Sequence, residues 1–173
     1  MDILPAFKKI NTFVLDIDGV LTDGSVLVLS DGSQARRMNI RDGYTLQLAV
    51  KKKYHVIIIS GAAESSVKDR LEKLGIQDIF FSVHNKLELL QELMKGYGLQ
   101  KEQVLYMGDD IPDLEVMQIC GIACAPADAV AEIKNIAHYI SPVNGGQGCV
   151  RDVMEKVFKM RGDWLNDSSI PSK

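Results

Sequence analysis

The sequence predicts an α/β fold in which helices cover both faces of an open parallel sheet. Short β-rich runs alternate along the chain with segments of helical periodicity, and this order is typical of βαβ units. Several of the runs are apolar without interruption, as in parallel strands that are buried on both faces. We expect strands near residues 12–17, 55–59, 79–82, 104–107 and 121–124, and helices near residues 43–53, 63–74, 86–97, 112–119, 128–136 and 148–160.

Length and composition indicate a single domain. The chain has 173 residues, of which 46% are hydrophobic, and its formal net charge is −3. This charge predicts neither a nucleic acid nor a membrane as partner, so any anion would have to be bound by a local cluster. Because no apolar run approaches about eighteen residues and no signal peptide is evident, we expect a cytoplasmic protein.

The cysteine pattern argues against two classes of protein. Cys120, Cys124 and Cys149 form no CxxC pair, and the three histidines add no zinc-binding spacing, so we expect reduced thiols. None of these cysteines is followed by arginine at the sixth position. This excludes a phosphatase with a cysteine nucleophile.

The chain is organised around the end of its first strand. Residues 12–15 suit a buried strand and run into Asp16 and Asp18, with Gly19 directly after them. Ligands of open α/β sheets bind beyond the carboxyl ends of the strands, and alternation along a strand sends both carboxylates to one side. Two carboxylates ~4 Å apart would repel by ~4 kcal/mol, which a Mg²⁺ ion would offset. The alternative is a plain acidic turn.

A β-hairpin is expected at about residues 25–40. Asp31-Gly32 is a strong turn signal, and residues 25–29 form an apolar arm. A two-stranded hairpin cannot cover both faces of such an arm by itself. One interpretation is burial against another subunit, and the other is a flap packed on its own domain.

Polar residues follow two further strands. Ser60 and Gly61 follow the apolar run 56–59, where they could bind phosphate oxygens or simply cap a helix. Asp109 follows the run 104–107 and is a candidate metal ligand. Asp110 and Asp113 could be an N-cap and a first-turn acid of the next helix.

Lys86 has an unfavourable charge for its expected position at the start of a helix. It follows Asn85, a good N-cap, and therefore places a cation in a first helical turn, against the helix dipole, at a cost of up to ~1 kcal/mol. Such a violation invites a functional explanation. Arg70 lies in the charged run 68–73, which is usual for a solvated face, so that run alone makes it a weak candidate for ligand contact.

Two features lie near the end of the chain. The glycine-rich loop 145–148 is either flexible backbone beside a substrate or a connecting turn. The polar residues at about 161–173, which include Trp164, are expected to form a mobile tail.

Together, the candidate residues supply the groups needed for one type of reaction. Asp16 could act as a nucleophile and Asp18 as a proton donor, while Asp109 could bind a metal. Ser60 and Lys86 add a hydroxyl and a cation for phosphate oxygens. This is what phosphoryl transfer through an aspartyl phosphate requires.

The motifs DIDGV, Ser60-Gly61, Lys86 and GDDIPD resemble those of the haloacid dehalogenase superfamily. Within it, the chain resembles the 3-deoxy-D-manno-octulosonate 8-phosphate (KDO 8-phosphate) phosphatases over nearly its full length. The matching stretches are residues 21–24, 39–44, 69–70 and 127–129 and the GGQGCVRD loop. The resemblance implies a Rossmann-like haloacid dehalogenase fold with a hairpin after the first strand and no cap domain.

The resemblance also implies a role for each site residue. Asp16 would be the nucleophile and Asp18 the general acid/base, and the Asp18 carbonyl would bind Mg²⁺ together with the carboxylates of Asp16 and Asp109. Lys86 and Ser60 would hold the phosphoryl oxygens, supported by Asp110 and Asp113. The implied substrate contacts are Asp18, Asn39, Ile40, Arg41, Asp42, Gly43, Arg70 and Lys86.

Further expectations concern the assembly and the specificity. The family forms capless tetramers in which hairpins pack together and a neighbouring subunit helps to close each site, so we expect a homotetramer. Two residues depart from the family pattern, because Ala62 and Gln47 stand where arginines are usual. An arginine expected to meet the carboxylate of a sugar acid is therefore absent, and the loss of this charge-assisted contact could lower affinity or shift preference towards a related acid sugar phosphate.

The function expected from the sequence is Mg²⁺-dependent hydrolysis of KDO 8-phosphate to KDO and phosphate, as in lipopolysaccharide precursor synthesis. A phosphatase of the related nine-carbon ulosonate 9-phosphate is the nearest alternative. A non-catalytic, phosphatase-like oligomerisation module is another, although it would not need to retain Asp16, Asp18, Lys86 and Asp109. A phosphorelay receiver domain would carry its phosphoacceptor on a later strand.

Overall fold

The computed structural model describes residues 3–164 and 167–171, and they form a six-stranded, wholly parallel sheet. The strand order is β5-β4-β1-β6-β7-β8, which confirms the predicted parallel α/β fold. The strands are β1 (Thr12–Leu15), β4 (His55–Ile59), β5 (Asp78–Phe80), β6 (Val104–Met107), β7 (Ile122–Ala125) and β8 (Tyr139–Ile140). Strand β8 was not predicted because this edge strand has only two residues.

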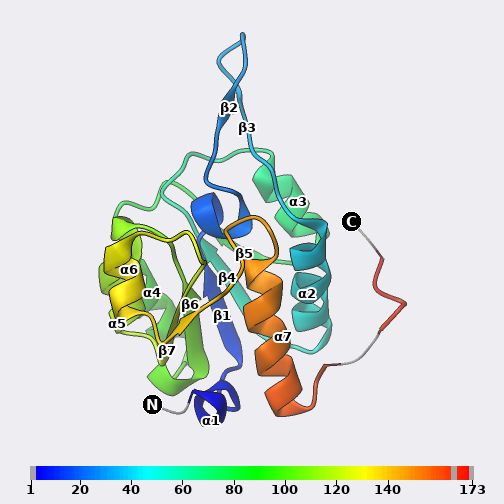
Figure 1. Ribbon diagram of the computed structural model, residues 1–173, viewed down its shortest axis with the longest axis vertical. Helices are drawn as coiled ribbons and strands as arrows, with labels where there is room; N and C mark the ends of the chain where they lie inside the picture. Colours follow the sequence, from blue (N-terminus) through cyan, green and yellow to red (C-terminus); the bar gives the residue numbers. More distant parts are fainter. Residues whose placement is uncertain (1–2, 165–166, 172–173) are drawn as a thin grey trace.

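Helices cover both faces of the sheet, as Figure 1 shows, with α2, α3 and α7 on one side and α4, α5 and α6 on the other. The helices are α1 (Leu4–Phe7), α2 (Ile40–Lys51), α3 (Val67–Lys73), α4 (Lys86–Tyr97), α5 (Leu114–Gln118), α6 (Ala131–Ile136) and α7 (Cys149–Arg161). Short helical turns occur at Ile17–Leu21, Lys101–Gln103 and Ile111–Asp113. Within the described ranges, no helix has both the length and the apolar composition needed to cross a membrane.

The apolar strands separate two cores. Phe13 and Leu15 of β1 pack on the side of α2 and α7, whereas Val14 packs on the side of α4 and α5. All three side chains are buried. Because successive residues of a strand point to opposite faces, a strand covered on both sides is apolar throughout.

Three helix starts illustrate the local rules. The Asn39 side chain accepts a hydrogen bond from the Arg41 N–H (2.8 Å), so α2 begins at Ile40 rather than near residue 43. Asn85 caps α4 as predicted, accepting from the Glu88 N–H at 3.0 Å. The helix expected from residue 63 instead begins at Val67, and residues 61–62 line a pocket.

The hairpin comprises β2 (Leu27–Val28) and β3 (Gln34–Ala35), and it projects from the body of the molecule (Figure 1). Val26, Leu27, Val28 and Leu29 are 41%, 64%, 67% and 44% exposed. These side chains are not buried on their own domain, so the flap interpretation is wrong.

The described part of the tail lies against α2 and α7. The Tyr44 hydroxyl is hydrogen-bonded to the backbone of Asp167, and Gln47 Nε2 donates to the Pro171 carbonyl at 3.0 Å. Trp164 stacks on Phe158 with ring centroids 6.4 Å apart. The tail is therefore bound to the helices in this structure, and residues 165–166 and 172–173 of the predicted tail lie outside the described residues.

Candidate active site

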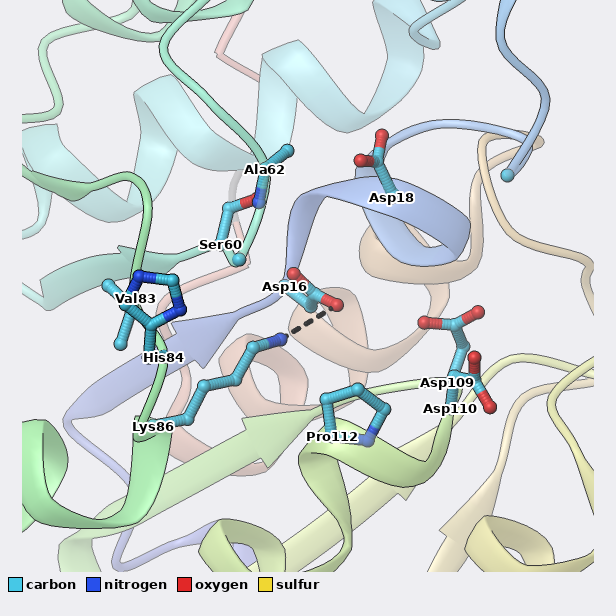
Figure 2. Close-up of a pocket in the computed structure, with 12 residues that line it drawn as sticks. Asp16, Asp18, Ser60, Ala62, Val83, His84, Lys86, Asp109, Asp110 and Pro112 are labelled. Carbon is cyan, nitrogen blue, oxygen red and sulfur yellow. Dashed lines mark hydrogen bonds and ion pairs between the residues drawn. The ribbon is translucent and has the colours of Figure 1, made fainter.

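A pocket of about 450 Å³ lies beyond the carboxyl ends of β1, β4 and β6, where the sequence places its polar residues. Figure 2 shows Lys86 pointing toward Asp16, with Asp109 to the right of this pair and Asp18 and Ala62 above it. The lining residues are Asp16, Asp18, Gly24, Ser60, Gly61, Ala62, Val83, His84, Lys86, Asp109, Asp110 and Pro112.

A tight turn after β1 positions the first two carboxylates. The strand ends at Leu15 rather than near residue 17, so strand alternation does not bring Asp16 and Asp18 to the same side. Asp16 Oδ1 accepts a hydrogen bond from the Ile17 N–H at 2.7 Å, and Gly19 then reverses the chain with φ +84°. Asp18 reaches the same pocket through this turn.

Lys86 is held between two carboxylates. Its Nζ lies 3.0 Å from Asp16 Oδ2 and 2.8 Å from Asp113 Oδ1, and its side chain is only 5% exposed. Burial lowers the pKa of Lys86, but the two carboxylates outweigh burial and raise it overall. These partners explain why a cation is tolerated in the first turn of α4.

Asp113 connects the residues of the site although it is completely buried. Its Oδ1 accepts hydrogen bonds from Lys86 Nζ and from the Tyr106 hydroxyl (2.7 Å), and its Oδ2 accepts from the Asp109 N–H (3.1 Å). Asp110 is exposed and caps the following turn by accepting from the Ile111 N–H at 2.8 Å. Asp113 therefore holds Lys86 and the Asp109 backbone in place, whereas the hydrogen bond of Asp110 lies within its own turn.

The acidic cluster fits a divalent cation. Oxygens of Asp16, Asp109 and Asp113 lie within 4.8 Å of one another. Burial and the nearby Asp113 carboxylate raise the pKa of Asp16 to about 8. Burial and the carboxylates of Asp113 and Asp110 raise the pKa of Asp109 to about 7. Asp109 Oδ1 is buried and has no hydrogen-bond partner among the described residues. Asp16 and Asp109 line the pocket whereas Asp113 is completely buried behind it, so Asp16 and Asp109 are the better ligands for a hard cation.

Glycines allow the site to close around Asp109. A Cβ on Gly19 would lie 1.9 Å from Asp109 Oδ2, and one on Gly145 would lie 1.9 Å from the Gly19 carbonyl oxygen. Gly146 donates its N–H to the Val20 carbonyl at 3.0 Å. The glycine-rich loop therefore packs directly on the turn that carries Asp16 and Asp18, a close approach that neither interpretation of the loop included.

Ser60 and Arg36 complete the surroundings of the pocket. Ser60 is buried, and its Oγ accepts a hydrogen bond from the Ala62 N–H at 3.1 Å. Arg36 binds both oxygens of Asp18, from Nε at 2.6 Å and Nη2 at 3.2 Å. Sequence reasoning missed Arg36, because nothing distinguishes it from Arg37, which is 85% exposed.

The expected substrate contacts from residues 39–43 and Arg70 are not in the lining of this pocket. Ile40 and Arg70 line a second hollow, together with Arg36, between the hairpin and α3. Arg41 lines a third hollow near α7, and the buried Asp42 carboxylate accepts a hydrogen bond from the Arg151 N–H at 2.7 Å. The single chain brings together the predicted phosphate-binding and metal-binding groups but not the predicted sugar contacts.

This fold and this site define a haloacid dehalogenase-like hydrolase, and a model of that family matches residues 75–153. The chain is 34% identical to the 3-deoxy-D-manno-octulosonate 8-phosphate phosphatase KdsC of Escherichia coli K12, over 93% of this chain and 86% of that protein. The chain belongs to this phosphatase family.

Solved structures agree with that assignment. A 3-deoxy-D-manno-octulosonate 8-phosphate phosphatase from Yersinia pestis superposes with a TM-score of 0.91 and 32% identity, covering 94% of this chain and 88% of that one. The enzyme from Moraxella catarrhalis, solved with magnesium, phosphate and KDO, has a TM-score of 0.90 and 30% identity, covering 94% of this chain and 93% of that one.

Proposed function

We propose that the chain is a Mg²⁺-dependent phosphatase that hydrolyses KDO 8-phosphate to KDO and phosphate, a step of lipopolysaccharide precursor biosynthesis. The observation that carries this proposal is the buried Asp16 carboxylate, which lies 3.0 Å from Lys86 Nζ and close to the carboxylate of Asp109, whose Oδ1 has no hydrogen-bond partner among the described residues. The magnesium, phosphate and KDO bound to the relative from Moraxella catarrhalis support the same metal and substrate.

In an aspartyl-phosphate mechanism, each residue of the site would have a separate role. The carboxylates of Asp16 and Asp109 and the carbonyl of Asp18 would hold Mg²⁺, which offsets the negative charge of the phosphoryl oxygens. An Asp16 oxygen attacks phosphorus while the bond from phosphorus to the sugar oxygen breaks, and Asp18 protonates that leaving oxygen. Asp18 then takes a proton from the water that hydrolyses the aspartyl phosphate. Lys86 and Ser60 hold the phosphoryl oxygens.

The sugar contacts are proposed to form in an assembly. Asn39, Ile40, Arg41, Gly43 and Arg70 would contact the sugar acid, with neighbouring subunits of a homotetramer helping to close each site. The hairpins would form the contacts between subunits, which is supported by their exposed apolar arm. The Asp42 carboxylate is committed to α7, so we propose that it holds the segment 39–43 in place.

Two further proposals concern location and specificity. We propose that the enzyme acts in the cytoplasm, where free thiols such as the three buried cysteines stay reduced. The alternative substrate, a nine-carbon ulosonate 9-phosphate, is favoured by one observation: Ala62 lines the pocket where a family arginine is usual.

A substrate panel tests this function. Phosphate release would be measured from KDO 8-phosphate, the nine-carbon analogue and p-nitrophenyl phosphate, with Mg²⁺ and with EDTA. We expect Mg²⁺-dependent turnover with a preference for KDO 8-phosphate, and loss of turnover in Asp16→Asn. The matched variant Glu132→Gln removes an exposed carboxylate on α6 and should behave like the unaltered protein. A preference for the nine-carbon substrate would overturn the substrate choice, and no turnover of any phosphomonoester would favour a non-catalytic module.

A further inference from the structure

Arg36 of the hairpin contacts the active-site residue Asp18. It lies directly after β3, on the returning arm of the hairpin, and donates from Nε and Nη2 to the two oxygens of Asp18. The Arg36 side chain is only 8% exposed, whereas that of Asp18 is 34% exposed. This bidentate arrangement is the geometry in which arginine recognises a carboxylate.

Arg36 and its partner Asp18 line two different hollows. Its partner Asp18 lines the pocket that contains Lys86 and Ser60, and Arg36 itself lines the hollow of about 210 Å³ between the hairpin and α3. A substrate with its phosphate near Lys86 would pass Asp18 as it extends out of the pocket. The Arg36 guanidinium is bonded to Asp18 at this point, and Arg70 lines the same hollow as Arg36.

The Arg36–Asp18 ion pair is incompatible with the proposed role of Asp18 as the proton donor to the leaving oxygen. Both carboxylate oxygens of Asp18 accept hydrogen bonds from the guanidinium. One of them has to face the leaving oxygen of the sugar during hydrolysis, so at least part of the pair has to open when substrate binds. A substrate that carries a carboxylate of its own can offer Arg36 an equivalent partner.

We propose that Arg36 is the residue that recognises the carboxylate of the substrate, and that it moves from Asp18 to that carboxylate when substrate binds. The proposal rests on the proposed function. It assigns to Arg36 the charge-assisted contact that Ala62 cannot make. It also makes the release of Asp18 depend on the substrate, because a phosphomonoester without a carboxylate leaves the Arg36–Asp18 pair closed.

The test compares substrates with and without a carboxylate. In Arg36→Gln, kcat/KM for KDO 8-phosphate should fall roughly 10- to 100-fold, mainly through KM, because a charged hydrogen-bonded contact is lost. The kcat/KM for p-nitrophenyl phosphate should stay unchanged or rise, because Asp18 is no longer paired. Arg36→Lys should recover part of the loss, since it keeps the charge without the bidentate geometry.

The control is Arg37→Gln, which removes the neighbouring, exposed arginine and should leave both substrates unaffected. Binding of KDO itself, measured by calorimetry, should weaken in Arg36→Gln and Arg36→Lys but not in Arg37→Gln. Equal losses on both substrates would assign Arg36 to positioning Asp18 only, and no loss on either would leave it without a role. Both results would overturn the proposal. Failure of the proposed function would appear separately, as absence of KDO 8-phosphate turnover by the unaltered enzyme.

Discussion

Asp113 sets the arrangement of charges in the active site from a completely buried position. It holds Lys86 and the backbone of Asp109, and it receives the Tyr106 hydroxyl from the strand beneath. Burying a carboxylate costs less when its oxygens accept hydrogen bonds in this way. Because Lys86 also contacts Asp16, the hydrogen bonds of Asp113 determine where the nucleophile's cationic partner lies.

Tyr106→Phe tests how much the hydrogen bonds of Asp113 contribute to stability and activity. It removes one hydrogen bond to a buried carboxylate, so the free energy of unfolding should fall by roughly 1.5–3 kcal/mol and kcat should fall several-fold. Urea unfolding and steady-state kinetics measure the two effects. Tyr97→Phe is the control, because it removes an exposed hydrogen bond to Asp78 and should change stability far less. Equal effects of the two substitutions would contradict this prediction.

Gly19→Ala should disable the metal site. The added Cβ would lie 1.9 Å from Asp109 Oδ2, so either the turn or Asp109 has to move. We expect at least a 100-fold loss of Mg²⁺-dependent turnover, by analogy with the cost of displacing catalytic groups by ~1 Å, and a weaker rise of Tm on addition of Mg²⁺.

Gly98→Ala provides the control for Gly19→Ala. Gly98 also has a positive φ (+66°) but faces open space at the end of α4. It should lose only ~1 kcal/mol of stability from backbone strain and keep its activity. The prediction would be refuted if Gly19→Ala retained full activity and the full thermal response to Mg²⁺.

At the scale of elements, α2 and α7 are joined by a buried cap. The Asp42 carboxylate, near the start of α2, accepts from the Arg151 N–H in the first turn of α7. Its second oxygen is buried and has no hydrogen-bond partner among the described residues. This contact links the segment 39–43 to the helix that follows the glycine-rich loop.

Asp42 should make stability depend on pH. Burial raises its pKa from 3.8 to about 6 in the folded protein. Between these values the unfolded chain has released the proton while the folded chain retains it, so stability falls as pH rises. This group should therefore remove about 2–3 kcal/mol between pH 4 and pH 7.

Asp42→Asn tests this dependence because it keeps an oxygen acceptor but cannot ionise. Urea unfolding of both proteins at pH 4.5 and 7.5 should show the unaltered protein losing more stability at the higher pH. Glu88→Gln, at an exposed position in the first turn of α4, should leave the dependence as it is. Parallel pH profiles for Asp42→Asn and the unaltered protein would show that Asp42 is not responsible.

At the scale of the whole molecule, the hairpin is the feature that a single chain leaves incomplete. Its apolar arm projects away from both cores, and two short strands bury little by themselves (Figure 1). This exposed apolar arm supports the proposed contact between subunits. The predicted sugar contacts lie outside the phosphate pocket of the single chain, which agrees with a site completed by neighbouring subunits.

Leu27→Asp should dissociate the proposed tetramer, because it places a charge in the apolar contact between hairpins. Sedimentation velocity would measure the assembly, and kcat/KM for KDO 8-phosphate should fall with it. Gln34→Glu adds the same charge on the partner strand of the hairpin without removing an apolar side chain, and it should stay assembled. An unchanged assembly in Leu27→Asp would exclude the hairpin as the main contact.

The strand-end residues could be predicted because parallel strands bring their carboxyl ends to one edge. Apolar runs locate the strands, so the residues after them, Asp16, Ser60 and Asp109, fall at one pocket whatever the details of the loops. Arg36 could not be predicted in this way. Its contact with Asp18 depends on the path of a hairpin between them, and no periodic pattern encodes that path.

The sequence by itself therefore determined five of the six strands, the order of the chemical groups and the edge where they meet, because burial and alternation are local properties of the chain. Only the tertiary structure decided how these groups are paired: Lys86 with Asp16 and Asp113, Arg36 with Asp18, and Asp42 with α7. The physical reason is that the partner of a charged side chain is set by the packing of segments distant in sequence, and its own neighbours in the chain do not specify it.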